Sequence, residues 1–267
     1  MEAHTDLIHS IDSDLSEQRI VTASSDKIVR VFNVKDANLT LQAELKGHNG
    51  PVTKAIFLNK GEMIASCSYN GTLIIWKLEG NNYGKKYEKQ LFNGSINSIC
   101  CNWHGDSFTI YSGCSDGRVR TSIFDSTLQV KESDFYCHRY GVSTVSSNEK
   151  YLVTGGMDST VGIFRLSDMS EMQRFKDHSN FVRCVAICPK NEFGITCFAS
   201  CSDDGTAIIY NLDGGFSKQV IKIGEPCYSL GWSRSGFSLT IGYGESKFKT
   251  FIPDASGKFK ETDMEKL

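Results

Sequence analysis

Hydrophobic and polar positions repeat along this chain in units. The stretch ASCSYNGTLIIW at 65–76 returns as ASCSDDGTAIIY at 199–210. The acidic or amide residue after the small polar run serves as an anchor, and six anchors follow at spacings of 44, 46, 42, 46 and 41 residues. These anchors are Asp26, Asn70, Asp116, Asp158, Asp204 and Glu245. The sequence therefore predicts six units of about 44 residues each.

The positions around each anchor keep their chemistry even where the letters differ. The residue four before the anchor is Ser or Thr in five of the six units, and the residue three before it is always small. After the anchor, apolar and β-branched residues alternate with others, as at Val29 and Val31, which predicts half-buried strands. Dipeptides such as Asn70-Gly71 predict tight hairpin turns between strands. With one more strand on each side, every unit contains four predicted strands and no helix.

Six four-stranded units of this length predict an all-β fold, a six-bladed β-propeller. The predicted blades cover approximately 5–46, 47–93, 94–137, 138–176, 177–223 and 224–263, within a single domain over 1–267 that ends in a short polar tail at 264–267. An aromatic residue stands six positions after five of the anchors. These residues are Phe32, Trp76, Phe164, Tyr210 and Phe251. Ser122 takes this position in the third blade, which we therefore expect to be the least firmly anchored.

Composition and charge narrow the function classes. The formal net charge is −2 and the sequence pI is near 6.3, so no broad basic field favours nucleic acid or an anionic membrane. The first residues show neither a basic leader nor an apolar signal core, and no apolar run approaches the length of about 18 residues that spans a membrane. We expect a cytosolic protein whose ten cysteines are reduced.

Catalytic and metal-binding patterns are weak. Cys184, Cys188, Cys197 and Cys201 suggest zinc, but residues four apart on a strand lie roughly 13 Å from each other, so buried small apolar side chains are the better interpretation. His4, His9, His104 and His138 have no mutual ligand spacing and are expected to be surface or structural residues. Serine, histidine and aspartate recur blade by blade without a G-x-S-x-G motif, which argues against a hydrolase. No enzyme activity, cofactor or metal is predicted.

Two sets of residues resemble the structural tetrad of WD-repeat proteins, in which His, Ser or Thr, Asp and Trp bridge the strands of one blade. The dipeptides Gly47-His48 and Asp177-His178 precede the first strands of their units. The corresponding sets are His48, Ser66, Asn70 and Trp76, and His178, Ser200, Asp204 and Tyr210. The aspartate of the WD dipeptide is absent, because Lys77 follows Trp76.

Longer stretches resemble one family closely. DLIHSIDSD, RIVTASSDKIVRVFNV, LKGHNGPV, ASCSYNGTLIIWK and DHSNFVRCVAICP are similar to successive blades of the small propeller subunit of the COPII vesicle outer coat. The resemblance covers most of residues 4–251 and is strongest in blades one, two and five. A paralogous propeller of the Y-shaped nuclear pore scaffold shares the first-blade pattern. LKGHNGPV and SCSYNGTLIIWK favour the coat subunit.

The chain ends favour an open propeller. Only MEAHT precedes the first unit, and GKFKETD is expected to give the last unit its own fourth strand, so no terminal latch is predicted. Uncovered apolar surface and unpaired strand edges then call for another chain. The family resemblance implies that a large α-solenoid coat subunit inserts a short β-sheet as an additional blade. The residues expected to contact it are Leu7, Ile8, Ile11, Tyr228, Leu230, Trp232, Phe248 and Phe251, each with intra-blade core as the alternative.

The resulting prediction is a non-enzymatic scaffold that rigidifies a solenoid partner. The family resemblance implies a place in the cytoplasm, on COPII vesicles formed at the endoplasmic reticulum for transport to the Golgi. It also implies a place in the nuclear pore scaffold, with a solenoid nucleoporin of the Y-complex as partner. Two alternatives stay open: the pore-only paralogue, and a closed WD-repeat adaptor that recruits peptides through its top surface.

Overall fold

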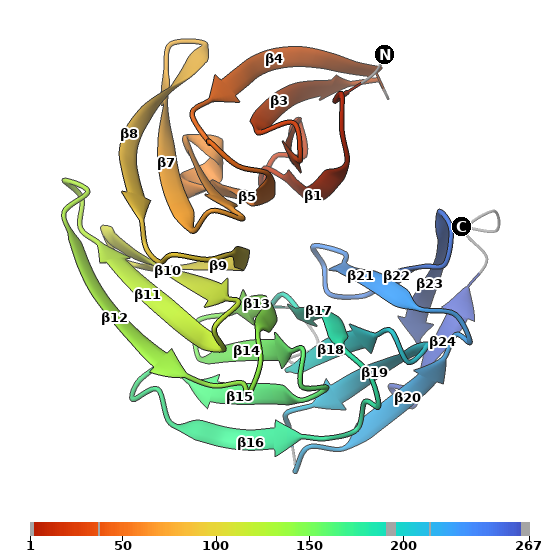
Figure 1. The fold of residues 1–267 in the computed structure, drawn as a ribbon. Helices are drawn as coiled ribbons and strands as arrows, with labels where there is room; N and C mark the ends of the chain where they lie inside the picture. Colours follow the sequence, from red (N-terminus) through yellow and green to blue (C-terminus); the bar gives the residue numbers. More distant parts are fainter. Residues whose placement is uncertain (1–2, 37, 191–195, 214, 263–267) are drawn as a thin grey trace. The chain divides into compact units, whose positions relative to one another are not determined.

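The computed structural model describes residues 3–36, 38–190, 196–213 and 215–262. These residues form six antiparallel four-stranded sheets, and in each sheet the strands pair in the order of the chain (Figure 1). No α-helix occurs in these ranges, and a single 3-10 turn, Asn59–Gly61, lies between two strands. The prediction of an all-β, six-bladed propeller fold is confirmed. The chain divides into two compact units, Met1–Tyr136 and Cys137–Leu267, which are described separately below.

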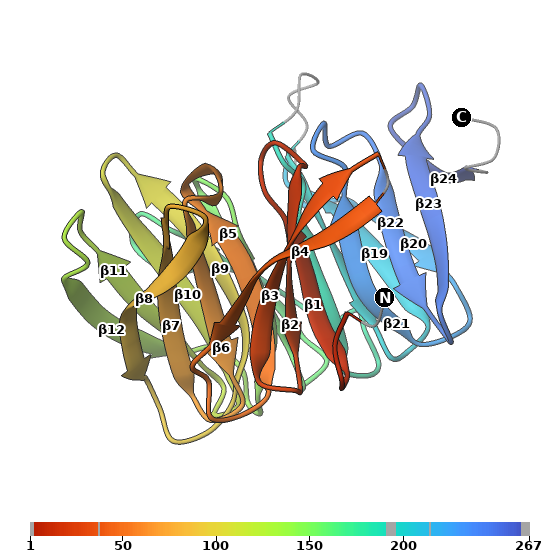
Figure 2. The same cartoon turned by 90° about the horizontal axis from the view of Figure 1, so that it is seen from above.

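The first unit contains three blades, whose strands are labelled in Figures 1 and 2. Blade 1 consists of β1 (Ile8–Ser13), β2 (Arg19–Ser24), β3 (Ile28–Lys35) and β4 (Asn38–Lys46). Blade 2 consists of β5 (Val52–Leu58), β6 (Met63–Ser68), β7 (Thr72–Glu79) and β8 (Asn82–Gln90). Blade 3 consists of β9 (Ile96–His104), β10 (Ser107–Cys114), β11 (Arg118–Phe124) and β12 (Val130–Tyr136).

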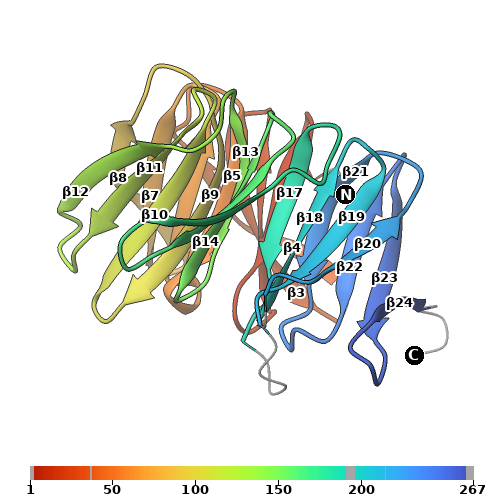
Figure 3. The ribbon, with the colours of Figure 1, turned by 90° about the horizontal axis from the view of Figure 1, so that it is seen from below.

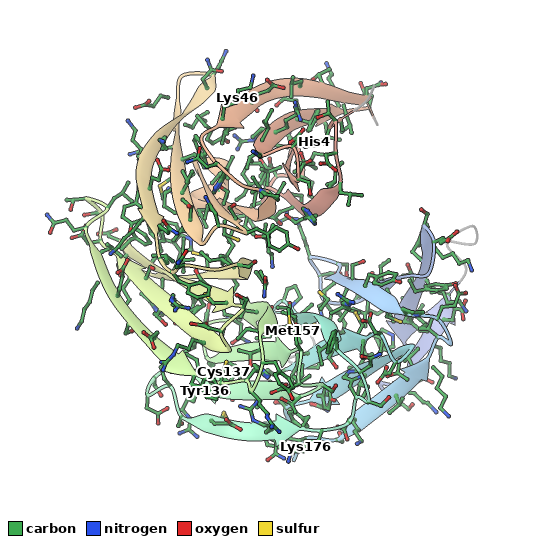
Figure 4. The ribbon with its side chains drawn as sticks, in the orientation of Figure 1. His4, Lys46, Tyr136, Cys137, Met157 and Lys176 are labelled. Carbon is green, nitrogen blue, oxygen red and sulfur yellow. The ribbon has the colours of Figure 1, made fainter. Side chains whose placement is uncertain are left out.

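The second unit contains the other three blades, seen from below in Figure 3. Blade 4 consists of β13 (Val142–Ser147), β14 (Tyr151–Gly156), β15 (Val161–Arg165) and β16 (Glu171–Phe175). Blade 5 consists of β17 (Val182–Ile187), β18 (Cys197–Ser202), β19 (Thr206–Asn211) and β20 (Lys218–Lys222). Blade 6 consists of β21 (Cys227–Trp232), β22 (Leu239–Tyr243), β23 (Lys247–Pro253) and β24 (Phe259–Thr262). Tyr136 and Cys137, on either side of the division between the units, are labelled in Figure 4.

The second and third strands of each blade carry the repeated pattern, and they are the most deeply buried. All six residues of β6 and of β18, the strands that carry the doubled phrase, are buried. The hairpin between β6 and β7 turns at Asn70-Gly71, where Gly71 has a φ of +80° that a side chain would strain. The fourth strand predicted from GKFKETD is present as β24, Phe259–Thr262. The predicted tail at 264–267 lies outside the described residues, and a single domain stays a prediction.

Apolar layers lie between successive blades within each unit. In the first unit, one cluster joins blade 1 to blade 2, and a second cluster joins blade 2 to blade 3. In the second unit, the corresponding clusters join blade 4 to blade 5 and blade 5 to blade 6. Close packing between twisted sheets explains the small residues three positions before each anchor, because Ala23, Cys67 and Cys201 are completely buried there.

Strand-bridging sites and a candidate interaction surface

The predicted tetrad of blade 5 joins its strands through His178. The Nδ1–H of His178 donates to Asp204 Oδ2 at 2.9 Å, and its Nε2 pairs with Ser200 Oγ at 2.7 Å. Burial by itself raises the pKa of Asp204, but hydrogen bonds from Thr206, from the backbone of Ser179 and from His178 outweigh it and lower that pKa. The hydroxyl of Tyr210 donates to Asp177 Oδ2 at 3.2 Å. His178, Ser200 and Asp204 are therefore joined inside one blade, and Tyr210 bonds to Asp177, the residue before the histidine.

The predicted tetrad of blade 2 is less complete. Ser66 Oγ pairs with His48 Nε2 at 2.7 Å and accepts a hydrogen bond from Trp76 Nε1 at 2.9 Å. His48 Nδ1 is buried and has no partner among the described residues, while Asn70 Oδ1 accepts from the backbone N–H of Thr72. Burial lowers the pKa of His48 to about 4. An amide in place of the anchor carboxylate thus leaves one histidine nitrogen unpaired.

Two further histidines bridge strands within their own blades in the same way, a more specific role than the surface or structural one expected from the sequence. In blade 4, His138 Nδ1 donates to Asp158 Oδ1 at 2.9 Å and Nε2 pairs with Thr154 Oγ1 at 2.8 Å. In blade 1, His4, labelled in Figure 4, makes the corresponding contacts with Asp26 and Thr22. For His4 the available signal was spacing, because His4 and His48 each stand 18 residues before the hydroxyl that they bind, whereas His138 stands 16 residues before Thr154. His9 and His104 are exposed.

These clusters have the residue types of a hydrolase but not its accessibility. Ser66, Thr154 and Ser200 are completely buried, and each is bonded to a histidine of its own blade. An attacking hydroxyl must reach a substrate, so this arrangement cross-links strands instead. Cys184 lies opposite Cys201 on β17 and β18. Among the described residues, no group of three or more His, Cys, Asp or Glu side chains is placed to hold a metal ion.

The residues predicted to contact a partner divide into two groups. Five of them are exposed: Leu7, Ile8 and Ile11 in blade 1, and Tyr228 and Phe248 in blade 6. The other three pack against the core cluster that joins blades 5 and 6: Leu230, Trp232 and Phe251. Trp232 Nε1 donates to the carbonyl of Ala186 at 3.0 Å, and its ring meets Phe259 edge-on. These three side chains pack between blades 5 and 6, and not only within their own blade.

Blades 1 and 2 show how unusual the exposed group is. Their strands have the same register, so Ile11, opposite Thr22, corresponds to Ala55, opposite Ser66. Ala55 is 0% exposed and Ile11 is 65% exposed. Blade 2 uses this face to pack on blade 1, whereas no blade of the first unit packs on the same face of blade 1. We call this face of blade 1 its outward face.

The same contrast recurs across the outward face. Ile8 is 42% exposed where blade 2 has Val52 at 0%, and Leu39 is 46% exposed where blade 2 has Tyr83 at 8%. The exposed side chains lie on β1 and β4, the two outer strands of the sheet, whereas Phe32 on β3 between them is 2% exposed. Single exposed apolar residues are ordinary on protein surfaces, but positions that the neighbouring blade buries are not ordinarily exposed together. The outward face is therefore the candidate interaction surface of the first unit.

Comparisons with known proteins agree with this architecture. The family model described as "WD domain, G-beta repeat" matches residues 1–33, 39–77, 86–121, 129–165 and 169–211. The protein named "Protein SEC13 homolog" of Caenorhabditis briggsae is 30% identical over 278 residues, which cover 96% of this chain and 91% of that protein. The chain belongs to the Sec13 family of WD-repeat proteins.

Other Sec13 relatives align over the same length. "Protein transport protein sec13" of Emericella nidulans is 27% identical over 294 residues, covering 97% of this chain and 94% of the relative. "Protein SEC13 homolog" of Drosophila melanogaster is 26% identical over 294 residues, which cover 98% of this chain and 82% of that protein. The repeat matches end at residue 211, so blade 6 of this Sec13-family chain is supported by its strands and not by the family model.

A charged cluster crosses the outward face of this Sec13-family chain. Arg30 donates from Nη1 to Asp26 Oδ2 at 2.7 Å and from Nε to Glu44 Oε1 at 2.8 Å. Burial raises the pKa of Asp26 by itself, but hydrogen bonds from Arg30 and His4 hold it well below its usual range. The arginine charge is thus already neutralised within blade 1, and an apolar cover needs no carboxylate opposite it.

No helix in the described part of the chain is long and apolar enough to cross a membrane.

Proposed function

We propose that this chain is a non-enzymatic scaffold subunit of a vesicle coat and acts in protein transport. Its Sec13 relatives carry the name of protein transport proteins, and they match 97% and 96% of this chain in the first two cases. Its Ser-His-Asp sets are buried inside blades, where they join strands and face no substrate. We place the protein in the cytoplasm, peripheral on COPII vesicles that leave the endoplasmic reticulum for the Golgi, and in the nuclear pore scaffold.

The partner we propose is a large α-solenoid coat subunit that donates a β-blade, with a solenoid nucleoporin of the Y-complex as its counterpart at the pore. The observation that carries this proposal is the outward face of blade 1, which exposes Ile8, Ile11 and Leu39 although blade 2 buries the same positions. In the described residues, the sheets of blades 1 and 6 each consist of four consecutive strands. Among the described strands, neither sheet takes one from the other end of the chain, which is consistent with a blade donated by a partner.

Ile11 and Leu15 provide a matched test. Ile11 is 65% exposed on the outward face, and Leu15 is 64% exposed in the turn between β1 and β2. Tagged full-length protein should capture a large solenoid chain from a lysate, identified by mass spectrometry. Ile11→Asp should abolish this capture, because a carboxylate buried under an apolar cover lacks a partner.

Leu15→Asp should leave the capture intact, and both variants should unfold at the wild-type urea concentration. Equal capture by the two variants would remove the outward face from the partner site. Phe248→Asp extends the test to blade 6, where Phe248 is exposed. Trp232→Asp is less informative, because the indole also holds blade 6 to blade 5 through Ala186.

A further inference from the structure

Blade 1 covers blade 2 in a specific way. The cluster between them includes Val21 and Ala23 of β2 and Val29 and Val31 of β3, so the covering face is lined by small and β-branched side chains. The innermost strand β1 adds hydrogen bonds across the junction. Ser10 Oγ accepts from the backbone N–H of Ala55 at 3.1 Å. Asp12 Oδ2 likewise accepts from the backbone N–H of Phe57 at 2.8 Å.

The second unit repeats this arrangement between blades 4 and 5. Thr144 Oγ1 accepts from the backbone N–H of Val185 at 3.3 Å, and Ser146 Oγ accepts from that of Ile187 at 3.1 Å. In both units the two oxygen-bearing side chains are two residues apart on the innermost strand. Between blades 2 and 3, Lys54 Nζ donates to Ser98 Oγ, and between blades 5 and 6, Trp232 Nε1 donates to the carbonyl of Ala186. Oxygen acceptors two residues apart are therefore one of the ways in which this fold joins neighbouring blades.

The outward face of blade 1 resembles the face that blade 2 offers to this arrangement. Ile8, Ile20, Phe32 and Leu39 stand where blade 2 has Val52, Ile64, Trp76 and Tyr83, and Ile11 replaces Ala55. The exception is Arg30 in place of Ile74, and its charge is neutralised by Asp26 and Glu44. Since Ile11 is larger than Ala55, the residue opposite it must be small.

We propose that the element covering blade 1 is a blade whose covering face reproduces blade 1's own. Its innermost strand carries a serine or threonine whose oxygen accepts the backbone N–H of Ile11, with a second oxygen-bearing side chain two residues away. Its next two strands present small and β-branched residues, as Val21, Ala23, Val29 and Val31 do in blade 1. This inference rests on the proposed function, because it specifies the chemistry of the blade that the partner donates.

The inference can be tested in the full-length protein by adding a copy of blade 1 in front of it. Residues 4–51 would be followed directly by Ile8–Leu267, so that the added Gly47–Pro51 connection enters β1 as it normally enters β5. The added His48 then stands where His4 stands in the original chain, because both lie 18 residues before the hydroxyl that they bind.

Amide hydrogen exchange in the original β1 is the readout. The added blade should slow exchange at Ile11 by about fivefold or more, the factor that one hydrogen bond of typical net strength contributes. Ser10→Ala in the added copy alone should restore most of that exchange, because it removes the acceptor. Val21→Asp with Val31→Asp in the added copy should abolish the protection of the whole strand, because both side chains belong to the covering face.

Exchange at Ile11 that is the same with and without the added blade would overturn the inference, and so would protection that survives the two aspartates. Capture of the solenoid partner is scored separately on the chain without the addition. Absence of capture would refute the proposed function, whereas the exchange result bears on the chemistry of the cover. If the proposed function and the inference about the cover are both correct, the extended protein should no longer capture the partner, because the added blade occupies the outward face.

Discussion

Arg19 of blade 1 donates a hydrogen bond from Nη1 to the hydroxyl of Tyr83 in blade 2, with 2.9 Å between the two atoms. Tyr83 in turn donates to the carbonyl of Gly61 at 2.6 Å, and Arg19 Nε pairs with Asp14 Oδ2 at 2.9 Å. Asp14 and Tyr83 are both buried. This chain of bonds joins blade 1 to blade 2 beside the apolar cluster between them, to which Tyr83 belongs.

Tyr83→Phe should therefore destabilise the protein. The change removes a buried hydroxyl that links Arg19 to Gly61, so the free energy of unfolding should fall by about 1–2 kcal/mol. Urea unfolding measures it. Tyr87→Phe on the same strand is the control, since its hydroxyl makes only a 3.4 Å contact with the exposed Glu132. Equal effects of the two substitutions would show that the Arg19 link contributes nothing.

The two serines of blade 3 should respond in the opposite direction. Ser112 Oγ and Ser122 Oγ are buried and have no hydrogen-bond partner among the described residues. Ser122→Ala removes one such group and should raise the free energy of unfolding by about 1 kcal/mol. Ser66→Ala should lower it by about 1–2 kcal/mol, because Ser66 joins His48 to Trp76. Denaturant midpoints of the two variants that shift the same way would contradict this account.

His48 should make stability depend on pH. Burial lowers its pKa in the folded chain from 6.5 to about 4, so between these values the unfolded chain binds a proton that the folded chain does not. Stability is then complete above pH 6.5 and is lost as the pH falls toward 4, by up to about 3 kcal/mol.

The histidine variant separates this effect from the titration of carboxylates. His48→Gln should flatten the pH dependence of the unfolding free energy in this window, whereas His104→Gln, at an exposed site, should leave it as in the wild type. Urea unfolding at a series of pH values measures both. An unchanged slope in His48→Gln would assign the pH dependence to other groups.

Gly71 should tolerate no side chain. Its φ is +80°, and a Cβ there would lie 1.9 Å from the carbonyl oxygen of Phe92. Gly71→Ala should destabilise the protein by about 3 kcal/mol, through strain and displacement of that backbone. Gly80 has a similar φ of +63°, but a Cβ there would have no atom within 4 Å, so Gly80→Ala should cost only about 1 kcal/mol of backbone strain. Thermal unfolding of the two variants separates the effect of the Phe92 contact from that of backbone strain. Equal losses of stability would show that the contact with Phe92 contributes nothing.

The sequence predicted more of the fold than of the interaction surface. Period-two alternation and turn residues such as Asn70-Gly71 act locally, so the strands of all six blades could be located from them. The histidine bridges of blades 1 and 4 were missed because His4 and His138 lack the residues that usually surround the motif. For His4, the spacing of 18 residues to the hydroxyl, which it shares with His48, was the remaining signal.

Whether a predicted contact residue is exposed depended on whether a neighbouring blade packs against its face of the sheet. Ile11 and Trp232 are both large apolar residues on innermost strands, and the repeat pattern alone does not separate them. The structure places Ile11 on the uncovered face of blade 1 and directs the indole of Trp232 to Ala186 of blade 5. Trp232 is partly buried against a neighbouring blade, whereas Ile11 is exposed.

By itself, then, the sequence determined the repeat, the four strands of each unit and the turn positions, because backbone preference and alternation depend on residues close together in the chain. Only the tertiary structure decided that Phe251 is core and that Ile8 and Ile11 are surface. Burial is a property of contacts between sheets about 44 residues apart in sequence, and equivalent positions of blades 1 and 2 differ because one has a neighbour and the other lacks one within its unit.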